Sequence, residues 1–236
     1  MYNNFIFDLY GTLIDIRTDE ESSIIWQNFA AYLQRYNIMA SAIDLKQEYN
    51  EETKKLLDLP SEFEYPEIDL IPVFYSICHS KNTNLTDADI FHIGEAFRKI
   101  STKYISLYPN TLKVLQSLKE NGKKIFLLSN AQKVFTMQEL SETKIIDYFD
   151  DIFISSEMGC RKPDKHFFDL LIKKHSLELC KSIMIGNDST SDIAGANAAG
   201  LDSLYVRTAI SPQNDPVPDC KYIFNDGDIG HVIELI

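Results

Sequence analysis

The sequence predicts an α/β fold in which a parallel sheet forms the core and an all-helical second domain is inserted into it. After residue 109, short apolar runs alternate with helical segments, as in a parallel sheet that is covered on both faces. Between about residues 16 and 106, apolar residues instead recur at helical spacing. We therefore expect a core of residues 1–15 and 107–236 and a helical domain of residues 16–106.

The first predicted strand is the apolar run Phe5-Ile6-Phe7, and it ends at an acid, Asp8. Open α/β sheets bind ligands at the carboxyl ends of their strands, so this carboxylate stands where a ligand site is expected. Gly11 allows the chain to turn sharply after the strand, and Thr12 adds a hydroxyl group beside the acid.

The inserted region reads as four amphipathic helices, which together predict a small bundle. Pro72 falls in the first turn of the third helix, where proline is tolerated. Three helices are expected to begin at a hydroxyl residue followed three positions later by an acid: Thr18 with Glu21, Ser41 with Asp44, and Thr86 with Asp89. The aromatic residues are expected mainly in the core of the bundle: Tyr32, Tyr36, Tyr49, Phe74, Tyr75 and Phe97.

The second half predicts five further strands separated by helices, and polar residues follow several of these strands. The strands are expected at 125–128, 152–154, 183–185, 204–206 and 222–224. Polar groups follow as Ser129-Asn130, Lys162-Pro163-Asp164, and Asn187-Asp188 with Asp192. Each group alone also fits an ordinary turn or helix start; Asp188 could be a helix N-cap and Asp192 a first-turn acid. Their shared place at the ends of strands in one sheet favours a common site.

Composition excludes several classes of partner. Thirty-five acidic and 23 basic residues give a net charge of −12, which disfavours nucleic acid and anionic membranes as partners. The four cysteines form no C-x-x-C pair, so free thiols are expected. No apolar run approaches the ~18 residues of a membrane helix and no basic-apolar leader is seen, so we expect a cytoplasmic protein. The sequence does not indicate the oligomeric state.

The four motifs, in this order, resemble those of the haloacid dehalogenase (HAD) superfamily, most of whose members are phosphatases. The motifs are D-x-Y-G-T from Asp8, the serine-bearing strand end at Ser129, Lys162-Pro163, and the acidic loop 187–192. The resemblance covers the whole chain and implies a Rossmann-like core with a helical cap inserted between the first two motifs. It also implies that the first and fourth strands of the core are neighbours, which would bring Asp8 and Asp188 together.

The resemblance implies roles for these residues. Asp8 would be the nucleophile that forms an aspartyl-phosphate, a covalent strategy that divides one difficult step into two. The resemblance implies Mg²⁺ as cofactor, a hard ion that prefers oxygen ligands, held by Asp8, Asp188 and the backbone carbonyl of Tyr10. Asn187 and Asp192 would not bind the ion as primary ligands but would hold its ligands, or a water bound to it, in position. The phosphoryl group of a small phosphorylated substrate would contact Gly11, Thr12, Ser129, Asn130 and Lys162.

The sequence departs from the family pattern at Tyr10. Phosphatases of the superfamily usually carry a second aspartate there, as general acid and base, whereas its 2-haloacid dehalogenases carry tyrosine. A phenol with a pKa of ~10 is a poor base at pH 7. We expect a Mg²⁺-dependent phosphatase of small metabolites because of Lys162 and the acidic loop. A metal-independent 2-haloacid dehalogenase that uses Asp8 as nucleophile is the alternative, with Arg17, Arg35 and Trp26 as candidates to hold its substrate. A weakly active or non-catalytic phospho-ligand-binding protein is the second alternative.

Overall fold

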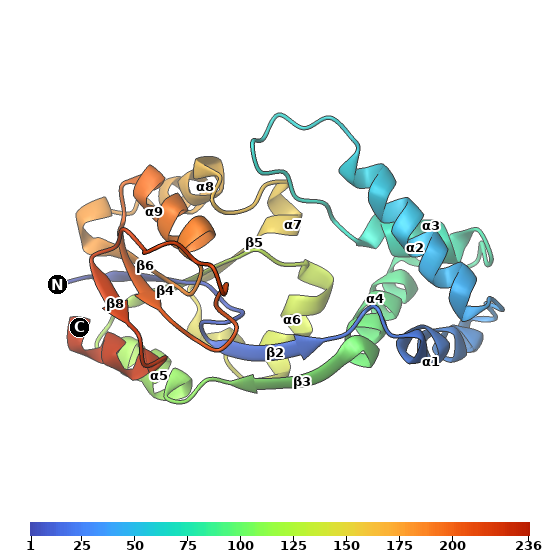
Figure 1. Ribbon diagram of the computed structural model, residues 1–236, viewed down its shortest axis with the longest axis horizontal. Helices are drawn as coiled ribbons and strands as arrows, with labels where there is room; N and C mark the ends of the chain where they lie inside the picture. The colour runs from blue at the N-terminus through green and yellow to red at the C-terminus, as the bar shows by residue number, and fades with distance from the viewer.

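A computed structural model describes residues 1–236, and its centre is a six-stranded parallel sheet (Figure 1). The strand order is β5-β4-β1-β6-β7-β8, so β1 lies between β4 and β6, as the resemblance implied. The strands are β1 (Asn4–Phe7), β4 (Lys124–Ser129), β5 (Asp151–Ile154), β6 (Ser182–Gly186), β7 (Asp202–Val206) and β8 (Tyr222–Phe224). The predicted α/β fold class is confirmed.

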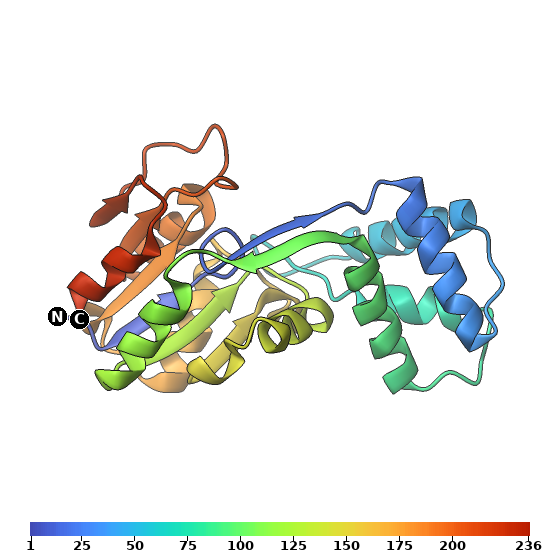
Figure 2. The same cartoon turned by 90° about the horizontal axis from the view of Figure 1, so that it is seen from below.

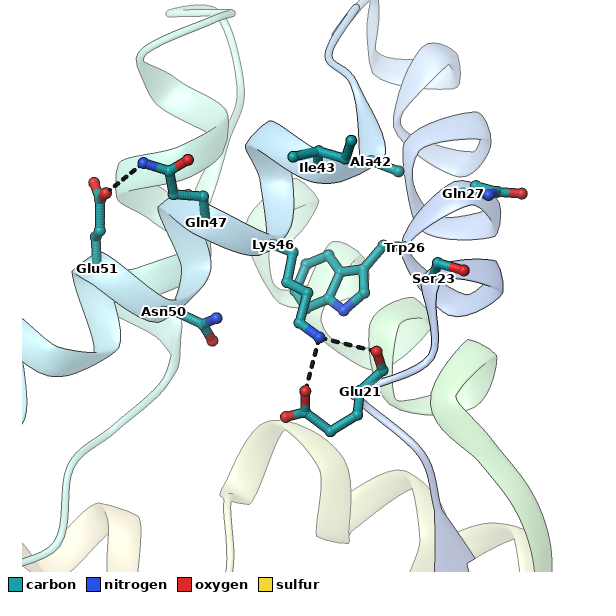
Figure 3. Close-up of a pocket in the computed structure, with 10 residues that line it drawn as sticks. All are labelled: Glu21, Ser23, Trp26, Gln27, Ala42, Ile43, Lys46, Gln47, Asn50 and Glu51. Atoms are coloured by element: carbon teal, nitrogen blue, oxygen red, sulfur yellow. Dashed lines mark hydrogen bonds and ion pairs between the residues drawn. The ribbon is translucent and has the colours of Figure 1, made fainter.

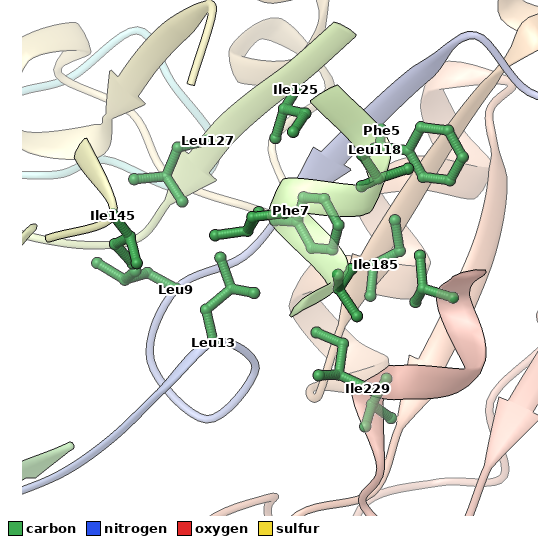
Figure 4. Close-up of a cluster of buried hydrophobic side chains, with 14 of the residues drawn as sticks. Phe5, Phe7, Leu9, Leu13, Leu118, Ile125, Leu127, Ile145, Ile185 and Ile229 are labelled. Atoms are coloured by element: carbon green, nitrogen blue, oxygen red, sulfur yellow. The ribbon is translucent and has the colours of Figure 1, made fainter. Parts of the chain in front are cut away.

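The sheet is covered on both faces, which explains why its central strands are continuously apolar. On one face, Phe5 and Phe7 of β1 pack against α5 and the C-terminal turn (Figure 4). On the other face, Ile6 packs against α8 and α9. Alternate residues of one short strand therefore enter two separate hydrophobic cores, as expected for a buried parallel strand.

Helices and single turns connect the strands of the core. Asp164 begins α8 as predicted, since its carboxylate accepts a hydrogen bond from the backbone of His166. The segments are α5 (Thr111–Glu120), α6 (Lys133–Glu142), η2 (Ile146–Tyr148), α7 (Ser155–Met158), α8 (Lys165–His175), η3 (Leu179–Lys181), η4 (Ser189–Ile193), α9 (Ala194–Ala199) and η5 (Ile229–Leu235).

The inserted cap is a helical unit at the opposite end of the molecule from the two chain termini (Figure 2). It contains α1 (Ser23–Leu33), η1 (Gln34–Tyr36), α2 (Ala42–Leu57), α3 (Ile71–His79) and α4 (Asp87–Ser101). Its own core includes Trp26, Phe29, Phe74 and Phe97, which are at most 2% exposed. The predicted N-caps at Ser41 and Thr86 are present. Tyr75 lies outside this core and is 43% exposed.

Two antiparallel strands, β2 (Ile14–Thr18) and β3 (Thr102–Leu107), join the cap to the core. The sequence analysis missed this ribbon. Thr18 was expected to start a helix but ends β2, and α1 begins five residues later at Ser23. Tyr104 was expected on the face of the fourth helix but lies in β3. The expected domain boundaries, near residues 16 and 106, fall inside the ribbon.

A third chain segment also ties the cap to the core. The α2–α3 loop crosses back to the core, where Arg161 N donates to the Tyr65 carbonyl at 2.9 Å and Glu67 N donates to the Gly159 carbonyl at 3.0 Å. The Gln132 side chain adds two hydrogen bonds, to Leu70 N at 2.9 Å and to the Ile68 carbonyl at 2.8 Å. The cap is therefore bound to the core beyond its covalent linkers. None of the helices is long and apolar enough to cross a membrane.

Candidate active site

Asp8 lies at the carboxyl edge of the sheet, immediately after β1, and is 7% exposed. Its backbone N–H donates to the Ile185 carbonyl of β6 at 2.9 Å, which holds the residue against the neighbouring strand. One carboxylate oxygen accepts from Lys162 Nζ at 2.7 Å and the other from Thr12 Oγ1 at 3.2 Å. A buried carboxylate with both oxygens oriented in this way is placed to act on a ligand at the sheet edge.

Lys162 joins two acids that lie far apart in the sequence. Its Nζ is 2.7 Å from Asp8 Oδ1 and 2.6 Å from Asp192 Oδ1, and its side chain is 1% exposed. The Asn130 side chain fixes the Lys162 backbone through hydrogen bonds of 2.8 and 3.0 Å to its N–H and carbonyl. Burial lowers the pKa of Lys162, but the carboxylates of Asp192 and Asp8 outweigh it, so its pKa is raised and the ammonium form is favoured.

Asp192 organises the loop that follows β6. Its second oxygen accepts the backbone N–H groups of Asn187 at 3.0 Å and of Asp188 at 3.1 Å. Gly186 makes this approach possible, since a Cβ there would lie 2.2 Å from Asp192 Oδ2. Burial raises the pKa of Asp192, while its ion pair with Lys162 acts in the opposite direction.

Asn187 lies against the loop that carries Asp8. Thr12 Oγ1 donates to Asn187 Oδ1 at 3.4 Å, and the Asn187 amide packs on Gly11, where φ is +88° and a Cβ would meet its nitrogen at 2.2 Å. Asp188 Oδ1 instead accepts from Thr190 N, Thr190 Oγ1 and Ser191 N, at 2.7 to 3.0 Å. Asp188 is therefore the N-cap of the following turn, the alternative that its position in the sequence had left open.

Tyr10 is tied into a network that links the core to the cap. Its hydroxyl donates to Glu139 on α6 and lies 3.0 Å from Thr136 Oγ1. Arg98 of α4, a cap residue, donates from Nε to the other Glu139 oxygen at 2.6 Å. Burial and the charge of Glu139 raise the pKa of Tyr10 well above its ordinary value, so its hydroxyl stays protonated.

Sequence reasoning did not find Glu139 or Arg98. Glu139 is 5% exposed and stands one helical turn from Thr136 on the buried face of α6. The one signal for it in the sequence is an acidic residue at a position of α6 where the helical spacing predicts an apolar one. Arg98 lies in the last turn of α4, where a cation is also favoured by the helix dipole alone.

Ser129 is fully buried at the end of β4, and its hydroxyl has no hydrogen-bond partner. Buried polar groups are almost always paired, so an unpaired hydroxyl at the carboxyl edge of a sheet suits a ligand. The structure thus brings four predicted site residues together. Asp8 contacts both Lys162 and Thr12, and Thr12 also contacts Asn187.

The oxygen donors at this edge match a hard divalent cation in kind. Asp8 offers a carboxylate, Asn187 an amide oxygen and Tyr10 a backbone carbonyl, and oxygen ligands are those that Mg²⁺ prefers. The structure contains no group of three or more His, Cys, Asp or Glu side chains arranged to hold a metal. A cation here would depend on neutral oxygen atoms and water for most of its coordination.

A separate cavity of about 540 Å³ lies in the cap between α1 and α2 (Figure 3). Lys46 crosses it and binds the side chain of Glu21 at 2.7 Å and its carbonyl at 2.9 Å. The residues that line it include Trp26 but none of the predicted site residues.

Comparisons with known proteins agree with the motifs. Residues 5–206 match the model of a family described as haloacid dehalogenase-like hydrolase. The chain is 30% identical over 116 residues to a ribulose-1,5-bisphosphate 5-phosphatase of Halopiger xanaduensis, covering 49% of this chain and 48% of that protein. It is 28% identical over 142 residues to a phosphoglycolate phosphatase of Vibrio cholerae, covering 60% and 62%. The chain spans about half the length of the curated relatives it matches.

The fold is similar to that of solved structures. YfnB of Bacillus subtilis, described as a putative HAD-hydrolase bound to magnesium, superposes with a TM-score of 0.57 at 19% identity, with 99% of this chain and 98% of that chain covered. The parallel core, the inserted helical cap and the four motifs in order all agree with the family match. The chain therefore belongs to the haloacid dehalogenase-like hydrolase family.

Proposed function

We propose that the protein is a Mg²⁺-dependent phosphatase of small phosphorylated metabolites that acts through an aspartyl-phosphate on Asp8. The observation that carries the proposal is the buried Asp8 carboxylate, oriented by Lys162 and Thr12 at the carboxyl edge of the sheet. The curated relatives named above and others of similar identity are phosphatases or nucleotidases. Their names support a phosphorylated substrate.

In this proposal, Asp8 Oδ attacks phosphorus and displaces the leaving oxygen. Lys162 offsets negative charge on the phosphoryl oxygens and on Asp8, while Asp192 holds its ammonium in place. The unpaired hydroxyl of Ser129 donates to a phosphoryl oxygen. The backbone of Gly11 and the hydroxyl of Thr12 line the same side of the site, and Asn130 fixes the Lys162 backbone.

Asp8, the Tyr10 carbonyl and Asn187 would hold the Mg²⁺ ion, and Asp188 would contribute through its second oxygen or through water. When bound, the ion would neutralise charge that develops on the transferring phosphoryl group. The metal assignment to Asp188, made from the sequence, stays a prediction, since the recorded contacts of Asp188 are with Thr190 and Ser191.

A phosphate-release assay tests the proposal. The protein is incubated with p-nitrophenyl phosphate, with Mg²⁺ and with a chelator. Metal-dependent release that is lost in Asp8→Asn and retained in Asp169→Asn supports it. Asp169 is an acid on α8 that pairs with Lys165 and Lys173 of the same helix. Release that persists in Asp8→Asn would exclude Asp8 as the nucleophile.

A 2-haloacid dehalogenase is the second candidate, because halide leaves without a proton and Asn187 adds no metal-binding charge. The residues expected to hold its substrate do not favour it: Arg17 is exposed on β2, the Arg35 guanidinium carbon lies 5.2 Å from the centre of the Tyr32 ring, and Trp26 is buried in the cap. Chelator-insensitive halide release from 2-chloropropionate would support this candidate. Neither activity, with measurable Mg²⁺ binding, would favour a weakly active or non-catalytic phospho-ligand-binding protein.

A further inference from the structure

We propose that the site acts on phosphoryl groups carried by a weakly basic oxygen, above all acyl phosphates, and that it hydrolyses alkyl phosphates poorly. The proposal rests on the proposed function and names the substrate class of the same site. It departs from the curated relatives, whose printed names refer to sugar, glycolate and nucleotide phosphates.

The hydroxyl of Tyr10 is engaged by two residues of α6. It donates to one oxygen of Glu139, and Thr136 Oγ1 lies 3.0 Å from it. Arg98 Nε binds the other Glu139 oxygen at 2.6 Å, and the Arg98 guanidinium stands over the Tyr10 ring, 5.7 Å from its centre. The side chains of Arg98 and Glu139 are only 14% and 7% exposed, so this network is shielded from water.

The network ties the phenol to the side of α6. Thr136 and Glu139 stand three and six residues after the first residue of α6, about 4.5 and 9 Å along the helix axis at ~1.5 Å per residue. Withdrawing the hydroxyl toward a substrate would remove one of the donors to the buried Glu139 carboxylate, which is unfavourable. We therefore infer that the Tyr10 side chain holds the loop after β1 against α6.

The groups that contact the Asp8 carboxylate do not include a carboxylic acid. The recorded partners of the Asp8 carboxylate are Thr12 and Lys162. The Lys162 ammonium is shared between two carboxylates, and the second of these, Asp192, also accepts two backbone N–H groups. The groups in contact with Asp8 thus provide a nucleophile and positive charge, and none of them is a free carboxylic acid.

Without a general acid beside Asp8, the rate depends on the basicity of the leaving-group oxygen. An alkoxide, whose conjugate acid has a pKa near that of water at ~16, needs a proton as it leaves. A carboxylate, with a pKa of ~4, leaves as a stable anion, and a phenolate, at ~10, is intermediate. General acid help is worth ~10²–10⁴ in rate, so its absence penalises alkyl phosphates by about that factor.

Both chemical steps balance without an acid from the protein. In the first, an Asp8 oxygen bonds to phosphorus, the P–O bond to the acyl group breaks, and its electron pair leaves on the substrate carboxylate. In the second, water attacks phosphorus and the electron pair of the broken bond returns to Asp8. Both protons of that water stay with the product, which leaves as dihydrogen phosphate. Because Asp8 is itself a carboxylate, it is also a weakly basic leaving group.

The test measures kcat/KM, in Mg²⁺, for acetyl phosphate, p-nitrophenyl phosphate, phenyl phosphate and glycerol 3-phosphate. We expect acetyl phosphate to exceed glycerol 3-phosphate by ~10² or more. Tyr10→Asp, which introduces a carboxyl group, should narrow that ratio by raising the value for glycerol 3-phosphate. Tyr10→Phe should leave the ratio between substrates unchanged, since the hydroxyl donates no proton to them. Tyr104→Phe, on the exposed ribbon, is the matched control for loss of a phenol hydroxyl.

The outcomes separate this proposal from the proposed function. Equal kcat/KM values for all four compounds would overturn the substrate class and leave the phosphatase standing. A selective loss of glycerol 3-phosphate hydrolysis in Tyr10→Phe would show that the phenol is an acid, and would also overturn the proposal. No phosphate release from any compound would overturn the proposed function, and the substrate class with it. If Tyr10→Asp does not fold, the wild-type series and Tyr10→Phe still decide the question.

Discussion

Replacing Arg98 by methionine removes the ion pair that joins the cap to the core. Arg98 Nε lies 2.6 Å from Glu139 Oε1, and both side chains are largely buried. Arg98→Met keeps most of the apolar stem over the Phe135 ring, 5.2 Å from the guanidinium carbon in the native protein, but leaves Glu139 without its counter-ion. Breaking one side of a buried pair costs ~3–5 kcal/mol, so we expect a loss of that order in the free energy of unfolding.

The neighbouring residue on the same helix provides the control. Lys99 lies 3.5 Å from Glu142, with side chains 71% and 46% exposed, and such a surface pair contributes ~0–1 kcal/mol. Lys99→Met should therefore change stability little. Urea unfolding, followed by the fluorescence of Trp26, the only tryptophan, measures both variants.

A double-mutant cycle assigns the effect to the pair. The Arg98→Met and Glu139→Gln double variant should be more stable than the sum of the single losses predicts, by ~1–3 kcal/mol. An Arg98→Met loss no larger than that of Lys99→Met, or a coupling free energy near zero, would refute the view that this pair binds the cap to the core.

Three further predictions concern the site loops and the core. Gly11→Ala should destabilise the protein by more than ~1 kcal/mol, because φ there is +88° and the new Cβ would overlap Asn187; thermal unfolding against Gly122→Ala, also at positive φ but in open space, measures the extra cost of the overlap. Asn187→Asp should tighten Mg²⁺ binding in calorimetry by adding a carboxylate; an unchanged affinity would exclude residue 187 as a ligand. Burial raises the pKa of Asp150, but Lys119, the Ile125 N–H and Lys124 outweigh burial and lower that pKa to about 2. The ionised carboxylate therefore stabilises the folded protein fully above a pH of ~4, and this stabilisation is lost as the pH falls toward 2. Asp150→Asn should thus cost ~1–2 kcal/mol at pH 7 and less at pH 3 in urea unfolding; an equal cost at both pH values would contradict this.

The fold was predictable where a single segment carries its own signal. Phe5, Ile6 and Phe7 have to be buried on both faces, which requires a central parallel strand. The capping box of Thr86 with Asp89 specifies the start of α4 within a few residues. Thr18 with Glu21 has the same spacing, but the pairing of β2 with β3, across the 83 residues 19–101 that lie between them, outweighs that local preference.

The proximity of three candidate site residues was predictable, but the orientation of the neighbouring side chains was less so. The motif order located Asp8, Lys162 and Asp192, which the structure joins in one chain of ion pairs. The contact of Asn187 with Gly11 and Thr12 depends on the turn after β6, and a sequence of adjacent polar residues does not specify that direction. The contact of Arg98 with Glu139 depends on how the cap docks, and neither residue carries a local signal for it.

The central step of the proposed function is the transfer of a phosphoryl group to Asp8. The direct measurement mixes the protein with acetyl phosphate and Mg²⁺, quenches in acid within one turnover, and analyses the peptide that contains Asp8 by mass spectrometry. The account predicts that this peptide gains the mass of one phosphoryl group, located on Asp8. Phosphate release without any modified Asp8 peptide, or with the phosphoryl group on another residue, would contradict it.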